Sequence, residues 1–170
     1  MSHFILAQII SLLGVLMSLA VYQVNRRSVM LWLTIGATIL YGISCLYLEA
    51  YTGALLDFLI AVQCYAFWKS DTSKQNLVVF GIFSVCATAI TVVTWSGLVS
   101  FLPFAGALVS SFASSQLMPK NIRRLALLST PFWLAFAVVI HSYPAAIINI
   151  AILISNIFGQ LRFDRKRLPA

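Results

Sequence analysis

The chain has 170 residues, of which 61% are apolar and 9% charged, against roughly 25% charged residues in an ordinary soluble domain. This composition excludes a soluble globular fold and predicts a single membrane domain over residues 1–170. The formal net charge of +7 comes from short basic segments between apolar stretches. We therefore interpret it as a signal of membrane orientation, and not as a surface for nucleic acid.

Seven apolar stretches follow one another, each close to the about 20 residues that a membrane-spanning helix needs. We expect an all-α membrane protein with helices at 4–23, 28–48, 52–68, 76–95, 98–116, 123–141 and 145–161. The break between the fourth and fifth helices depends on Trp95, Ser96 and Gly97, which interrupt the apolar run without a charge. Without this break, later basic segments would lie on the opposite side of the membrane from earlier ones.

The basic residues occupy alternate connections between the predicted helices. All eleven Lys and Arg lie in the segments 26–27, 69–74, 120–124 and 162–167. The intervening connections, near Glu49, Gly97 and His141, contain no Lys or Arg. By the positive-inside rule, the basic segments and the C-terminus should face the cytoplasm and the N-terminus should face outward.

The sequence also contains a candidate internal repeat. A shift of 92 residues superimposes the first three predicted helices on the last three and pairs identical residues, for example Ser18 with Ser110. We predict two parallel three-helix units, 4–68 and 98–161, joined by one inverting linker helix at 76–95. Because one chain contains both units, a monomer would suffice for a site between them.

Two pairs of residues related by this shift are candidates for binding a ligand. Asp57 is the only acidic residue inside a predicted span, and it pairs with Asn149, while Tyr41 pairs with Trp133. An ionisable group in hydrocarbon costs at least about 2.5–3.5 kcal/mol, so Asp57 indicates a functional cavity. In each unit the two residues lie equally far from the turn between their helices, so all four should reach one depth. We interpret them as a cage for a small polar molecule, with aromatic faces for its ring or apolar surface and polar groups for its hydroxyls or amines.

The last helix adds a further candidate, with alternatives. Asn149, Asn156 and Gln160 form one polar stripe, either the lining of a solute pathway, which adds Asn156 to the substrate-binding residues, or a packing seam. Tyr41 and Trp133 also fit an aromatic belt at the membrane surface, and Asn149 also fits hydrogen bonding between helices. No cofactor or metal is expected, because the three cysteines lie within apolar stretches without His partners.

The predicted architecture, with aromatic and Asn residues sixteen positions apart in the second and third helices of a unit, resembles the SWEET and PQ-loop superfamily of sugar and amino-acid transporters. The nicotinamide riboside carriers are similar in architecture. The opening segment, residues 7–68, from AQIISLLGVL to VQCYAFW, looks still more like the YgjV family. This resemblance covers nearly the whole chain and implies a multi-pass protein of the bacterial inner membrane. The resemblance to the sugar transporters implies a binding role for Trp133 and Asn149, whereas Tyr41 and Asp57 depart from that pattern, so a sugar is not specified.

We predict a transporter of a small polar solute, such as a sugar, vitamin, nucleoside or amino acid, that works by alternating access, with Asp57 as a candidate for proton coupling. The alternative is a non-transporting inner-membrane protein with an assembly or regulatory role, in which the polar residues are packing contacts. An enzyme is not expected, since the chain has no HExxH pair and no phosphate-binding glycine loop. The expected partners are the lipid bilayer and the solute.

Overall fold

The structure is a computed structural model that describes residues 2–164, except for the side chains of residues 2, 3, 144 and 148. Over these residues the chain forms seven α-helices and one 3-10 turn. They are α1 (Ser2–Tyr22), α2 (Arg27–Tyr47), α3 (Tyr51–Lys69), α4 (Ser73–Val93), the 3-10 turn η1 (Leu98–Ser100), α5 (Phe101–Ser114), α6 (Pro119–Val139) and α7 (Tyr143–Phe163). Six helices are long and apolar enough to cross a membrane, and Leu98–Ser114 is a shorter apolar helix.

The helices α4 and α6 begin three or four residues earlier than hydropathy predicts. α4 begins at Ser73 instead of 76, because the side chain of Thr72 accepts a hydrogen bond from Gln75 N at 3.3 Å and so caps the first turn. α6 begins at Pro119 instead of 123, since proline is favoured in the first turn of a helix. Hydropathy identifies the apolar part of each span, whereas capping determines where the helix starts.

The predicted break after the fourth helix is confirmed. α4 ends at Val93, and Gly97 adopts φ 96° and ψ −167° before η1 begins. This backbone conformation is accessible almost only to glycine. A glycine turn therefore separates α4 from α5 where no charge marks the boundary.

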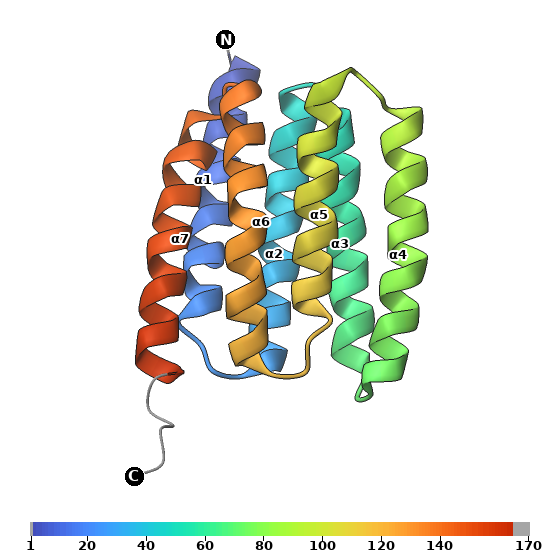
Figure 1. Ribbon diagram of the computed structural model, residues 1–170. Helices are drawn as coiled ribbons and strands as arrows, with labels where there is room; N and C mark the ends of the chain where they lie inside the picture. The colour runs from blue at the N-terminus through green and yellow to red at the C-terminus, as the bar shows by residue number, and fades with distance from the viewer. Residues whose placement is uncertain (1, 165–170) are drawn as a thin grey trace.

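The helices run alternately in opposite directions, so their connections lie at two ends of the bundle (Figure 1). The end with the connections α1–α2, α3–α4 and α5–α6 carries the basic residues from Arg26 to Arg124, and we call it the basic end. The other end carries the connections at Glu49, Gly97 and His141, and we call it the Glu49 end.

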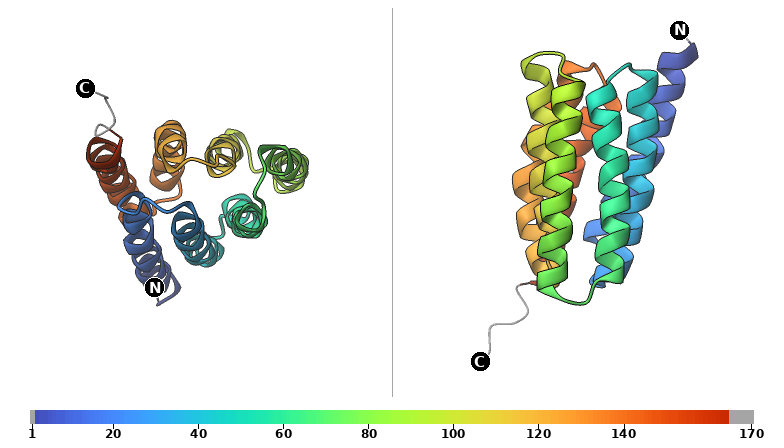
Figure 2. Two further views of the ribbon diagram at one scale, coloured as in Figure 1. Left: turned by 90° about the horizontal axis from the view of Figure 1, so that it is seen from below. Right: turned by 90° about the vertical axis from the view of Figure 1, so that its right-hand side faces the viewer.

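The helices form two rows (Figure 2). The first row is α1, α2 and α3, and the second is α5, α6 and α7, with sequence neighbours in contact inside each row. The rows meet where α1 contacts α7 and where α3 contacts α5, and α4 packs against α3 and α5. A buried cluster fills that side of the bundle: Leu31, Leu56, Ile60, Cys64, Phe67, Phe83, Ala87 and Ala107.

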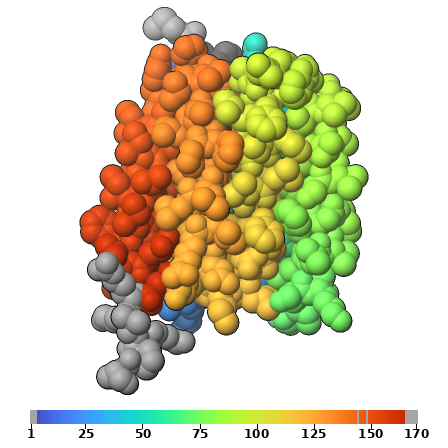
Figure 3. Space-filling model, in the orientation of Figure 1, coloured from blue at the N-terminus to red at the C-terminus, as the bar shows by residue number. Residues whose placement is uncertain are grey.

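Large apolar side chains cover the outside of the bundle. Val62, Val85 and Val93 are 67%, 71% and 84% exposed. Figure 3 shows the face on which α4, α5, α6 and α7 lie side by side. A surface of this kind is stable against lipid chains and would be costly in water.

Candidate functional site

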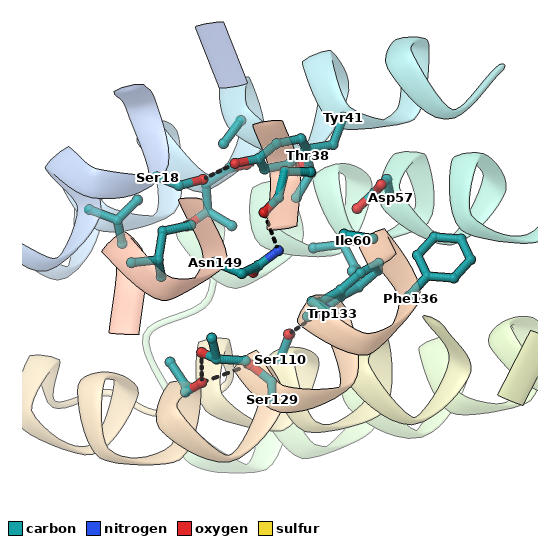
Figure 4. A pocket seen from close by; sticks show the side chains of 18 of the residues that line it. Ser18, Thr38, Tyr41, Asp57, Ile60, Ser110, Ser129, Trp133, Phe136 and Asn149 are labelled. Carbon is teal, nitrogen blue, oxygen red and sulfur yellow. Dashed lines mark hydrogen bonds between the residues drawn. The ribbon is translucent and has the colours of Figure 1, made fainter. Parts of the chain in front are cut away.

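A pocket whose lining includes several polar side chains lies between the two rows, formed by residues of α1, α2, α3, α5, α6 and α7 (Figure 4). The volume of the pocket, measured for the centres of water-sized spheres, is about 160 Å³. One water occupies about 10–15 Å³ on this measure. The pocket therefore has room for a small metabolite.

Four of the five predicted site residues line this pocket: Tyr41, Asp57, Trp133 and Asn149. They come from four helices, α2 and α3 in the first row and α6 and α7 in the second. The structure therefore brings together the two pairs that the sequence shift relates.

Asn156 lies outside the pocket lining. Its side chain is fully buried, and its Nδ2 donates to the backbone oxygen of Arg123 at 2.8 Å. Its Oδ1 accepts from Gln160 Nε2 at 3.4 Å. These contacts favour the packing-seam alternative for the lower part of the α7 stripe, because Asn156 joins α7 to α6.

The two aromatic residues are held in the same way in the two rows. The hydroxyl of Tyr41 donates to Ser18 Oγ at 3.2 Å, and Trp133 Nε1 donates to Ser110 Oγ at 3.0 Å. Ser18 and Ser110 are related by the same shift of 92 residues as the two aromatics. The sequence analysis did not assign these serines to the site. The signal that could have found them is that the shift of 92 residues pairs one serine with the other.

A glycine provides space for each aromatic ring. A Cβ atom at Gly14 would lie 3.2 Å from Cε1 of Tyr41, and one at Gly106 would lie 3.0 Å from Nε1 of Trp133. Gly14 and Gly106 are also 92 residues apart. Each ring therefore packs directly against the first helix of its own row.

Asp57 is the only formally charged side chain in the pocket lining. It is 4% exposed, and within residues 2–164 no hydrogen bond or ion pair is formed by its carboxyl group. Burying a carboxylate without a partner is costly. The lining also contains ten Ser and Thr residues, which the sequence analysis did not collect into one site.

A second cavity opens at the Glu49 end, and both Glu49 and His141 line it. Phe136 and Ile140 line this cavity and also the central pocket. Phe136 is 5% exposed, and a Cβ at Gly53 would lie 2.6 Å from its Cε1. The ring of Phe136 therefore packs on α3 between the two cavities.

At the basic end, the guanidinium of Arg27 connects the two rows. Its Nε donates to the backbone oxygen of Gln116, which follows α5, at 3.1 Å. One terminal nitrogen donates to the backbone oxygen of Phe67 in α3 at 2.8 Å. Arg27 thus joins the end of its own row to the first helix of the other row.

Arg123 makes a corresponding connection from the second row. It is 1% exposed, donates to the backbone oxygen of Val24 after α1 at 3.4 Å, and forms an ion pair with Asp164 after α7. Val24 and Gln116 are 92 residues apart. Each arginine therefore reaches a carbonyl of the opposite row, and the shift of 92 residues relates these two carbonyls in the sequence.

Within the part of the chain that the structure describes, no three His, Cys, Asp or Glu side chains are grouped as a metal site requires. The apolar helices and their lipid-compatible surface define a multi-pass membrane protein. The chain belongs to the Imp-YgjV family, described as bacterial inner membrane protein, whose family model matches residues 5–167. No curated protein and no solved structure matches the chain. Its family and its apolar helices together show that it is a multi-pass protein of the bacterial inner membrane.

Proposed function

We propose that this protein transports a small polar solute that binds in the central pocket. The observation that carries the proposal is the meeting of Tyr41, Asp57, Trp133 and Asn149 around one cavity inside an apolar bundle. Aromatic surface with a few convergent polar groups is typical of small-molecule sites. Ionisable residues inside a membrane domain commonly line solute or ion pathways.

We propose also that the two rows are the halves of a parallel internal repeat, with α4 as the linker and the solute site between them. The paired hydrogen bonds of the two aromatics support this arrangement. The turns at Glu49 and His141 add support, because φ is 58° at the first and 55° at the second. In both turns the next residue donates its N–H to the carbonyl five positions back at 2.9 Å.

Transport by alternating access requires that contacts between the rows break at one end at a time. In our proposal, Arg27 and Arg123 close the basic end, which faces the cytoplasm by the positive-inside rule, and Phe136 closes the Glu49 end. Asp57 is the candidate for proton coupling, since a carboxyl in the pocket can take up and release a proton during the cycle. Similarity to the SWEET and PQ-loop transporters stays a prediction.

The test is ligand-induced stabilisation of the purified protein, followed by uptake into vesicles. A ligand that binds only the folded state raises apparent stability. We expect a hit from a panel of amines, sugars, nucleosides, vitamins and amino acids, and loss of its effect in Trp133→Ala and Asn149→Ala.

The matched control is Trp68→Ala. Trp68 donates to Ser28 and contacts the ring of Trp32, away from the pocket, so this variant should keep the ligand response. A panel without any hit, together with vesicles that show no uptake, would favour the non-transporting assembly or regulatory role.

A further inference from the structure

On the basis of the proposed transport function, we infer that the solute is a small organic cation whose protonated nitrogen pairs with Asp57. The inference rests on three properties of the pocket: its charge, the direction of its hydrogen bonds, and its aromatic surface.

The lining contains one acidic side chain and no basic one. Asp57 is accompanied in the lining by three other titratable side chains, Tyr22, Tyr41 and Cys45, none of which can become a cation. Arg27 of α2 and Arg123 of α6 bond to backbone oxygens and to Asp164 at the basic end. A positive charge that balances Asp57 must therefore come from a proton or from the ligand.

Several hydrogen-bond donors of the lining are already used within the protein. Five hydroxyl groups donate to backbone carbonyls at 2.8–3.0 Å, those of Thr34, Thr38, Ser44, Ser129 and Thr130. A hydroxyl that has donated its hydrogen offers only lone pairs to a ligand. These five groups therefore act as acceptors toward the cavity.

The donors of the predicted cage residues are also engaged. Tyr41 and Trp133 donate to serines, and Asn149 Nδ2 donates to the backbone oxygen of Ala145 at 2.8 Å. The two serines keep their hydroxyl hydrogens, and Asn149 keeps one amide hydrogen and its Oδ1. The two oxygens of Asp57 add acceptors, and three further hydroxyls of the lining can still donate, those of Ser11, Tyr22 and Ser142.

A ligand for such a pocket must supply hydrogens and positive charge, as an ammonium or guanidinium group does. The rings of Tyr41 and Trp133 add π surface, which attracts cations electrostatically. A neutral polyol can bond to the hydroxyls of the lining, but it brings no positive charge to pair with the carboxyl of Asp57. The pocket therefore favours an amine over a sugar.

A consequence follows for coupling. The carboxyl of Asp57 cannot hold a proton and pair with a cation at the same time, so proton and solute compete for one site. Binding of the cation should then release a proton and should weaken as the pH falls. Exchange of one proton for one cation is the form of proton coupling that this geometry supports.

The experiment compares probes that match in shape and differ in charge, on the full-length protein in detergent or nanodiscs. The pairs are putrescine with 1,4-butanediol and ethanolamine with ethylene glycol. We expect each amine to raise the apparent melting temperature and to bind at least tenfold more tightly than its diol. We expect Asp57→Asn to reduce amine affinity at least tenfold, with part of the affinity retained in Asp57→Glu.

Asp57→Asn replaces a buried carboxyl with a neutral amide of nearly the same size, so it should remain folded, and its melting temperature without ligand checks this directly. Equal binding of diols and amines, or amine affinity unchanged in Asp57→Asn, would overturn the cation assignment. If a neutral solute binds and loses its effect in Trp133→Ala while the amines do not bind, the transporter proposal survives and the cation assignment fails. If no probe and no panel compound binds, both fail.

Discussion

Nε1 of Trp133 in α6 donates a 3.0 Å hydrogen bond to Oγ of Ser110 in α5. The bond joins two helices of one row, as the bond between Tyr41 and Ser18 does in the other row. The pocket walls are therefore braced within each row. A movement of one row against the other can change the pocket without breaking either bond.

Ser110→Ala should lower the stability of the folded protein. The substitution leaves the half-buried indole N–H of Trp133 without its acceptor, and an unsatisfied donor costs up to about 1–3 kcal/mol when it is fully buried. Thermal unfolding in detergent measures the loss. The control is Ser129→Ala, because Ser129 bonds only to the carbonyl of Ala126 in its own helix; an equal loss in both variants would show that the Trp133 bond contributes nothing specific.

Arg123→Ala should be strongly destabilising. The ion pair with Asp164 is nearly inaccessible to solvent, with side-chain exposures of 1% and 8%, and removal of one partner of a buried pair costs about 3–5 kcal/mol. Arg124→Ala is the matched control, since Arg124 is exposed in the same turn. Comparison of the two melting temperatures tests the contact, and similar small shifts would mean that Arg123 does not hold the rows together.

Gly159→Ala should disrupt the contact between α1 and α7. A Cβ at this position would lie 2.4 Å from the backbone oxygen of Tyr22, and a backbone atom cannot move aside as a flexible side chain can. Gly81→Ala is the control, because a Cβ there meets nothing within 4 Å, and alanine in a helix is favoured over glycine by about 1 kcal/mol. We expect opposite shifts in melting temperature, and a tolerated Gly159→Ala would contradict the close packing.

Cysteine labelling in a background without native cysteines should give the orientation of the bundle. Glu49→Cys and Ser96→Cys should react with an impermeant maleimide added to intact spheroplasts, whereas Lys74→Cys and Arg124→Cys should react only after permeabilisation. All four positions are exposed. If Ser96→Cys reacts only from the cytoplasmic side, positions 49 and 96 lie on opposite sides of the membrane, which would contradict the seven-span arrangement.

The helices and their boundaries were largely predictable from the chain. Backbone groups in a bilayer must be satisfied inside each span, so spans appear directly as apolar stretches, and Gly97 marks a break because no other residue readily adopts its backbone angles. The pocket residues Asp57 and Asn149 were also predictable. A polar group in an apolar span is costly, and its depth follows from its distance to the nearest turn.

The role of each polar side chain was not predictable in the same way. Asn149 and Asn156 lie two turns apart on one stripe, yet Asn149 lines the cavity and Asn156 bonds to the backbone of α6. Local pattern places both on one face of α7. Which of them faces open space depends on how closely the neighbouring helix approaches at each level.

Arg123 also combines a property that the sequence predicts with one that only the tertiary structure determines. Its charge contributes to the basic pattern that predicts orientation, a property of composition that needs no knowledge of contacts. Its burial against Asp164 and Val24 brings together positions 41 and 99 residues apart. Such contacts depend on the rotation and spacing of whole helices, which no short stretch of sequence encodes, and the same applies to the direction of the hydrogen bonds around the pocket.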